Sequence, residues 1–211
     1  MWIEATPSSW AAVVIGVMVG VYWLRVMQLV WRTKKTAGRA ANLVPPELLG
    51  RVLRLIWGPV VVLWIFLPML MPFVRGLPVG LRPVVFAGSE VVGWIAAAVV
   101  AAAFAVTWVC WVRMGTSWRM GIDPNEKTNL ILTGPYAYVR HPIYGLSQVM
   151  MVATFCAWPS AVMGVVAILH LCLMQWEVRR EDRYLVMLHG PVYGEYVKRV
   201  GRFVPRFSRW K

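Results

Sequence analysis

Long apolar stretches, separated by short polar segments, dominate the chain. Three of these stretches, at 10–31, 55–73 and 91–112, carry few charges. A helix needs about 20 apolar residues to cross the hydrocarbon core of a bilayer. Each of the three stretches is therefore predicted to be a membrane-spanning helix.

Two shorter apolar runs, at 143–157 and 161–176, follow a polar stretch and predict a helical hairpin. The Trp-Pro-Ser sequence at 158–160 is typical of a tight turn between them. Because both arms are shorter than a usual span, we expect the hairpin to be tilted or shallow. The second arm is expected to continue as a helix through Leu188, until a glycine–proline pair at 190–191 ends it.

Together these elements predict an all-α, polytopic membrane protein with about five transmembrane helices, a C-terminal helical hairpin and cytoplasmic helices. The composition agrees, because 59% of the residues are hydrophobic and only 15% are charged. A typical soluble domain is about 45–50% apolar and about 25% charged. The chain also holds 13 Trp, and indole rings favour the membrane–water interface.

The net charge is +13, and its basic residues lie between the apolar stretches, as they do in a membrane protein. We therefore expect no nucleic-acid partner. Basic residues gather at 32–54, 113–142 and 177–211, and the only others are Arg25, Arg75 and Arg82. With five crossings, the three basic segments share one side of the membrane. Basic flanks stay in the cytoplasm and attract anionic membrane lipids. The N-terminus is therefore expected outside and the C-terminus inside.

A GxxxG motif lies in the first apolar stretch, at Gly16 and Gly20. This spacing lets the backbones of two helices approach closely. We expect the motif to pack within the monomer, and a homodimer is the alternative.

The three cysteines, Cys110, Cys156 and Cys172, all lie within apolar stretches. They form no CxxC pair, and no histidine lies at metal-ligand spacing from them. They are interpreted as small buried hydrophobic residues, and no metal site is predicted.

Polar residues suited to chemistry gather in two segments, 133–145 and 179–185. The predicted hairpin joins these segments, and its arms are similar in length, so both segments should meet at the cytoplasmic membrane surface. Together they offer an arginine, a histidine, several tyrosines and two carboxylates. Glycine and proline in these segments also leave backbone groups outside regular helix and available to a ligand. Such a set suits a zwitterionic, aromatic, water-soluble ligand beside a lipid-facing groove.

Each of these residues also has a structural interpretation when it is taken alone. Arg140 would contact lipid headgroups, and His141 would cap or pack a helix. The carboxylates of Glu181 and Asp182 would form a solvated helix face beside neighbouring arginines. The tyrosines would anchor the chain at the interface: Tyr136, Tyr138 and Tyr144.

Three sequence motifs follow one another in the C-terminal half. Residues 134–145 read GPYAYVRHPIYG, residues 179–185 read RREDRYL, and residues 189–205 read HGPVYGEYVKRVGRFVP. In this order and spacing they resemble the isoprenylcysteine carboxyl methyltransferase family, which includes bacterial relatives and phospholipid methyltransferases. The resemblance covers about residues 128–206, and the N-terminal spans are similar only in being apolar.

The resemblance implies methyl transfer from S-adenosylmethionine to a hydrophobic or lipid-like acceptor. Glu181 would hold the cofactor's amino group or a neighbouring donor. Arg140 would orient the methionine carboxylate or an anionic acceptor, because its planar fork suits carboxylates. These two are the predicted catalytic residues. Besides Glu181, the predicted cofactor-binding residues are Tyr136, Tyr138, His141, Pro142, Tyr144, Gly145, Asp182, Tyr193 and Tyr196.

The chain departs from the family's usual pattern at a few positions. Leu146 stands where the family has glycine, and Asp182 stands where it has a second glutamate. The prenylcysteine enzymes carry arginine just ahead of the acidic pair, where this chain has Gln175 and Glu177. The acceptor is therefore left open among lipid amines, thiols, phenols and carboxylates.

We interpret 1–211 as a single membrane domain, with three spans in 1–112 and a cofactor-binding region in 113–211 that contains the hairpin 143–176. Two other functions stay open. One is an NADPH-dependent membrane reductase of the sterol-reductase type, although such enzymes are usually longer. The other is a non-enzymatic membrane scaffold or transporter subunit, which predicts no cofactor affinity.

Overall fold

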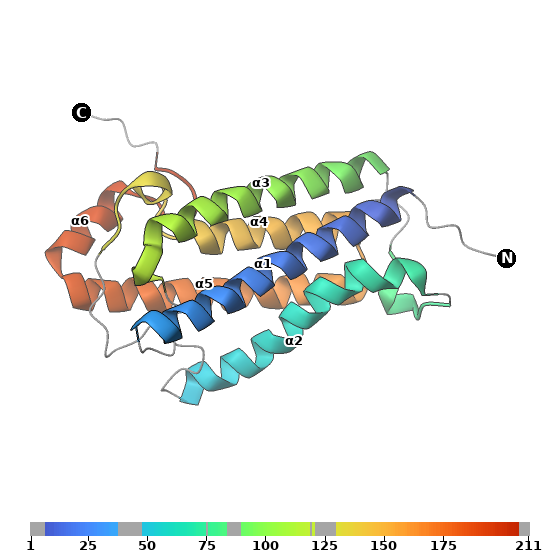
Figure 1. Cartoon of the computed structure of the whole chain (residues 1–211), viewed down its shortest axis with the longest axis horizontal. Coiled ribbons are helices and arrows are strands. Elements are labelled where there is room, and N and C mark those ends of the chain that lie inside the picture. Colours follow the sequence, from blue (N-terminus) through green and yellow to red (C-terminus); the bar gives the residue numbers. More distant parts are fainter. Residues whose placement is uncertain are drawn as a thin grey trace.

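Five helices of the described chain run side by side along a bundle, and a short sixth helix lies at one end (Figure 1). The structure is a computed structural model that describes residues 7–37, 48–74, 76–83, 90–118, 120 and 130–206. The helices are α1 (Pro7–Ala37), α2 (Leu48–Leu70), α3 (Glu90–Met114), α4 (Pro142–Ala157), α5 (Ala161–His189) and α6 (Pro191–Arg199). The prediction of an all-α polytopic membrane protein is confirmed.

The predicted spans coincide with the observed helices. By length and composition, α1, α2, α3 and α5 are apolar enough to cross a membrane, whereas α4 is a shorter apolar helix of 16 residues. The predicted stretches 10–31 and 91–112 lie inside α1 and α3. The stretch 55–73 runs through α2 and ends in a 3-10 turn at Met71–Phe73. The number of crossings stays a prediction.

Helices α4 and α5 form the predicted hairpin, and the turn residues explain its shape. The Ser160 side chain accepts a hydrogen bond from the backbone N–H of Met163 and so caps the start of α5. Helix α5 then continues well beyond its apolar part to His189, one residue further than predicted. Gly190 ends it with a φ of 54°, a conformation that favours glycine.

The basic ends of the helices gather at one end of the bundle. Figure 1 shows that α1, α3 and α5 end, and α2 and α4 begin, at the end that carries α6. This is the grouping that the distribution of lysine and arginine predicts for five alternating passes. The same end brings together the start of α4 and the end of α5, which hold the two chemically interesting segments. The orientation of this end relative to a membrane stays a prediction.

The GxxxG motif packs α1 against α2 within the chain. A Cβ on Gly16 would lie 2.7 Å from the Cβ of Met69 and 2.9 Å from the carbonyl oxygen of Ile65. Gly20 is less crowded, because a Cβ there would lie 3.6 Å from Cγ2 of Ile65. The close helix approach expected from the sequence is therefore made at Gly16, and a homodimer stays a prediction.

Replacing Gly16 by Ala is expected to destabilise the protein more than replacing Gly20 by Ala. The methyl group at Gly16 has to displace backbone atoms of α2, and overpacking of this kind costs about 1–3 kcal/mol. Both substitutions gain the same helix propensity, so the difference between them isolates the close contact. Thermal unfolding of the two variants in one detergent measures this difference, and equal midpoints would contradict the packing.

Polar pairs also tie α2 to the hairpin inside the apolar bundle. The indole N–H of Trp64 donates to Oγ1 of Thr154 at 2.9 Å. The indole N–H of Trp57 donates to Nδ1 of His170 at 3.5 Å, and Nε2 of His170 lies 3.1 Å from Oγ of Ser147. Because lipid offers no hydrogen-bond partners, these pairs satisfy groups that would otherwise be buried alone. They fix α2 against α4 and α5.

Candidate active site

The segment after α6 folds back beside the residues that lead into α4. The backbone N–H of Arg140 donates to the carbonyl of Gly201 at 2.9 Å, and that of His141 donates to the carbonyl of Arg202 at 3.1 Å. A Cβ on Gly201 would overlap the carbonyl oxygen of Val204. This return of the chain therefore requires glycine, and it brings the closing motif of the sequence against the start of the hairpin.

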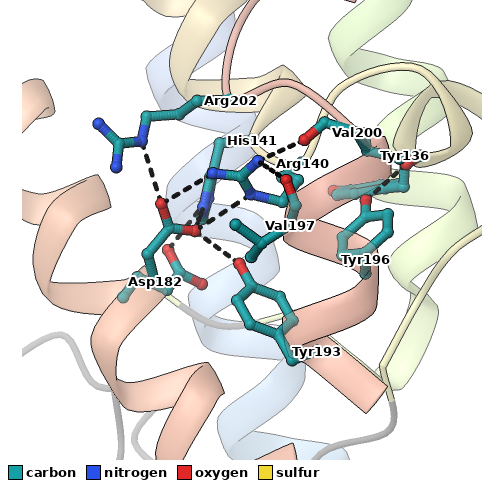
Figure 2. A network of polar contacts seen from close by, with 10 residues as sticks. Tyr136, Arg140, His141, Asp182, Tyr193, Tyr196, Val197, Val200 and Arg202 are labelled. Atoms are coloured by element: carbon teal, nitrogen blue, oxygen red, sulfur yellow. Dashed lines mark hydrogen bonds and ion pairs between the residues drawn. The ribbon is translucent and has the colours of Figure 1, made fainter. Parts of the chain in front are cut away.

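The carboxylate of Asp182, on α5, is the centre of a buried network (Figure 2). Its Oδ1 accepts hydrogen bonds from Nε2 of His141 at 2.8 Å and from the hydroxyl of Tyr193 at 2.6 Å. Its Oδ2 accepts from Nη2 of Arg140 at 3.2 Å and from Nε of Arg202 at 3.0 Å. Because a carboxylate only accepts, Nε2 of His141 carries a proton. These five residues form the Asp182 network, which joins α5 to α6, to the segment after α6 and to the residues that precede α4.

Arg140 is only 7% exposed, and its guanidinium faces the protein. Besides Asp182, it donates to the backbone carbonyls of Val197, at 3.4 Å, and Val200. A cation at the C-terminal end of a helix also complements the helix dipole. Arg140 therefore clamps the end of α6 to α5. Its contact with a cofactor or an acceptor stays a prediction.

Two tyrosines project from α6 into the same region. Tyr193 reaches Asp182, and the hydroxyl of Tyr196 donates to the carbonyl of Tyr136 at 2.5 Å. Burial raises the pKa of Tyr136 and Tyr193, and it raises the pKa of Tyr196 to about 12. All three phenols therefore stay protonated at physiological pH, and those of Tyr193 and Tyr196 act as hydrogen-bond donors.

Glu181 directly precedes Asp182 but is in a different situation. Its Oε2 lies 3.8 Å from Nδ1 of His141, yet this buried oxygen has no hydrogen-bond partner among the described residues. The ring of His141 also contacts Tyr144 edge-on, with ring centroids 5.8 Å apart. His141 is therefore held between two carboxylates, and Glu181 is the one with an acceptor left for a ligand.

A cavity of about 180 Å³ opens beside these residues, between all six helices. The start of α4 and helices α5 and α6 contribute polar groups to its lining. The first three helices and the segment after α3 contribute aromatic rings, those of Tyr22, Trp23, Trp57, Trp111 and Trp118. Within the described parts of the chain, no cluster of three or more His, Cys, Asp or Glu side chains is suited to a metal ion.

Most of the predicted site residues line this cavity: Tyr136, Arg140, His141, Pro142, Tyr144, Glu181, Tyr193 and Tyr196. The other three do not. Asp182 organises the network that holds the lining residues. Gly145 packs against Phe203, whose ring would lie 3.4 Å from an added Cβ. Tyr138 is 69% exposed and is not among the lining residues.

The sequence motifs do not identify the cavity residues that α1 and α2 contribute. Trp23 and Trp57 have the pattern of interfacial tryptophans, and Arg54 has the pattern of a basic flank. One signal in the sequence points to Arg54, because it lies three residues before Trp57 and ten before Trp64. A period of 3.6 residues puts all three on one helix face, and Trp64 is fully buried.

Comparison with known proteins gives matches to the C-terminal half and to bacterial relatives. Residues 94–187 match the model of the isoprenylcysteine carboxyl methyltransferase (ICMT) family. The chain is 29% identical over 119 residues to the nickel-cobalt-cadmium resistance protein NccN of Alcaligenes xylosoxydans xylosoxydans, covering 56% of this chain and 55% of the relative. It is 29% identical over 100 residues to the cobalt-zinc-cadmium resistance protein CzcN of Cupriavidus metallidurans, covering 46% of each. The chain thus spans about half the length of these curated relatives. No solved structure matches it.

Proposed function

The segment 94–187 belongs to the isoprenylcysteine carboxyl methyltransferase family, and from this premise we propose that the protein transfers a methyl group from S-adenosylmethionine to a hydrophobic or lipid-like acceptor. The family inferred from the sequence motifs is confirmed. Its name states the general reaction, and the apolar helices are those of an integral membrane protein. Our proposal adds three points to the family match: the cofactor, the class of acceptor and the residues in contact with them.

The observation that carries the proposal is the buried oxygen of Glu181 beside a cavity of mixed character. Oε2 of Glu181 has no hydrogen-bond partner in the described chain, and a buried acceptor left unpaired costs about 1–3 kcal/mol. The ammonium group of an amino-acid ligand would satisfy it. The aromatic rings in the rest of the lining suit a purine and an apolar acceptor. The residues present therefore fit S-adenosylmethionine.

In this proposal Glu181 and His141 would hold the amino-acid part of the cofactor, and Tyr144 would help to close the pocket. Tyr193 and Tyr196 would pack over it from α6. When bound, the sulfonium group supplies an electrophilic methyl carbon for an in-line displacement. Such a step depends on alignment more than on acid–base help. The contribution of the protein is then orientation, for which the Asp182 network fixes His141 and Tyr193.

We place the site on the cytoplasmic side of a bacterial inner membrane as part of the same proposal. The helix ends beside the basic segments gather at the end of the bundle that carries α6 (Figure 1), and basic flanks favour the cytoplasm. A water-soluble cofactor would then reach the polar lining from the cytoplasm. A lipid-like acceptor would reach the aromatic lining from the bilayer, and the N-terminus would lie outside.

Calorimetric titration of the detergent-purified protein with S-adenosylmethionine tests this function. Saturable binding is expected, whereas NADPH, added in the same way as a control ligand, is expected to give no binding. Incubation of the protein with methyl-labelled S-adenosylmethionine and a membrane lipid extract should then move the label into the organic phase. Binding of NADPH but not of S-adenosylmethionine by folded protein would replace the proposal with the reductase function.

A further inference from the structure

Two hydrogen-bond donors in the cavity lining come from the part of the chain that precedes the family match. Trp23, on α1, is 8% exposed, and its indole N–H has no partner among the described residues. Arg54, on α2, also lines the cavity. Both residues lie outside the segment 94–187, so the family match does not cover them.

The guanidinium of Arg54 is poorly satisfied by the protein. It donates to the carbonyl oxygen of Met120 at 3.2 Å, and its Cζ lies 5.0 Å from the centroid of the Trp57 ring. None of the described carboxylates forms an ion pair with it. An arginine has five N–H donors, and the hydrogen bond to Met120 leaves most of those of Arg54 unused within the described chain.

Trp57 brings the two donors onto one wall. Its ring contacts the ring of Trp23 edge-on, with centroids 5.1 Å apart, and it contacts the guanidinium of Arg54 as described above. Trp57 is itself held by its hydrogen bond to His170. Within the described chain, a rigid aromatic ring thus separates an unpaired indole N–H from a cation that makes one hydrogen bond and whose acidic neighbour, Glu177, forms no salt bridge with it. We call these three residues the α1–α2 wall.

The other charged groups of the cavity are already engaged by the protein or carry the opposite charge. Arg140 is held by Asp182 and by two carbonyls of α6. Arg180 pairs with Glu177, with Nε and Oε2 3.8 Å apart, and the charge of Glu177, which also acts on Arg54, is thus shared between two arginines. Glu181 presents an acceptor and so suits the cationic part of a ligand. An anionic group in this cavity therefore finds its best unpaired donors on the α1–α2 wall.

We propose that the α1–α2 wall is a carboxylate-binding site, in which Arg54 and the indole N–H of Trp23 hold the carboxylate of a ligand in the cavity. The inference rests in part on the proposed function, which offers two sources of that group. One is the methionine carboxylate of S-adenosylmethionine, whose amino group would face Glu181. The other is a carboxylate on the methyl acceptor. The planar fork of arginine suits either one.

The test uses two pairs of ligands, and within each pair one member carries a carboxylate and the other lacks it. The first pair is S-adenosylmethionine and its decarboxylated analogue, measured by calorimetry. The second is dodecanoate and 1-dodecanol, measured by the shift in unfolding temperature of the same protein. Arg54→Gln should weaken the carboxylate member of one pair by about tenfold or more and leave its partner unaffected, because charged hydrogen bonds are the strong ones.

Two further variants sharpen the result. Trp23→Phe removes the N–H and replaces the indole by a smaller phenyl ring, which affects both members of a ligand pair. The affinity difference between the two members of the responding pair should therefore fall by a smaller, several-fold factor, and this difference reports the lost N–H. Arg51→Gln is the matched control, because Arg51 lies on the same helix, is exposed and does not line the cavity. This control should leave all four ligands at wild-type affinity, which separates the local contact from the loss of a positive charge.

The pair that responds identifies the source of the carboxylate. A response of the first pair assigns the α1–α2 wall to the cofactor, and a response of the second assigns it to the acceptor. Affinities of Arg54→Gln that match the wild type for both pairs would overturn the proposal and leave Arg54 as a cap for the carbonyl of Met120. Failure of the wild type to bind S-adenosylmethionine would refute the proposed function, while the second pair would still test the wall.

Discussion

Asp182→Asn is expected to cause the largest loss of stability of any single isosteric change in the site. The amide keeps the shape of the side chain but removes the charge that faces Arg140 and Arg202. Its NH₂ group would also point at a donor, since the protein donates to both carboxylate oxygens of Asp182. Removing one partner of a buried ion pair costs about 3–5 kcal/mol. The unfolding midpoint in detergent measures the effect.

The matched control for this prediction is Glu195→Gln. Glu195 is an acidic residue on α6 that pairs with Lys198 at 2.7 Å, and its side chain is 61% exposed. Exposed pairs of this kind contribute little to stability, so the control should unfold with the wild type. Limited proteolysis adds a local readout, because the segment after α6 is expected to become cleavable in Asp182→Asn. A wild-type midpoint and an intact C-terminal segment in that variant would contradict the role assigned to the network.

Glu181→Gln is expected to act differently from Asp182→Asn. It should cause a large loss of ligand binding without a loss of stability. Oε2 of Glu181 makes no hydrogen bond in the described chain and lies 3.8 Å from Nδ1 of His141, so the amide should replace the carboxylate in the free protein without a large loss of stability. An ammonium group would lose its ion pair with the carboxylate, which weakens binding by about tenfold or more. Calorimetry with S-adenosylmethionine and thermal unfolding of the same preparation measure the two properties together.

The comparison of the two neighbouring acids is informative because each serves as a reference for the other. Asp182→Asn should lower both stability and binding, whereas Glu181→Gln should lower binding alone. Labelled methyl transfer to a membrane extract should fall in both variants. A Glu181→Gln protein that binds S-adenosylmethionine as the wild type does would remove Glu181 from the site, and a lower unfolding midpoint would show that its role is structural.

The different roles proposed for Asp182 and Glu181 also bear on Arg140. The sequence places Arg140 among the chemical groups, and the structure shows its donors directed to Asp182 and to the end of α6. A residue that holds the frame of a site affects binding through the positions of its neighbours. In our proposal the α1–α2 wall recognises an anionic group, and the predicted contact of Arg140 with a cofactor or an acceptor stays a prediction.

The sequence by itself determined the class of the fold and predicted much of the candidate site. Span length, the turn at 158–160 and the glycine at 190 act locally, so the hairpin and its continuation followed from them. The hairpin in turn predicts that the segments 133–145 and 179–185 meet. Most of the residues chosen from these segments, and from the closing motif, line one cavity.

Only the tertiary structure decided which of the two acids is the centre of the network. Glu181 and Asp182 are adjacent in the sequence, and one residue turns the direction of a side chain by about 100° around a helix. The rotation of α5 against α4 and α6 therefore sends one carboxylate into the network and leaves the other beside the cavity. That rotation is set by packing, for which the motif carries no signal.

The contribution of the first two helices was likewise decided by the tertiary structure. Trp23, Arg54 and Trp57 have the pattern of interfacial and flanking residues, because nothing local indicates which helix they will face. Their place in the cavity depends on contacts between residues far apart in the chain, such as the hydrogen bond from Trp57 to His170. The sequence thus determines elements and their ends through local forces, whereas long-range packing decides which side chains share a site.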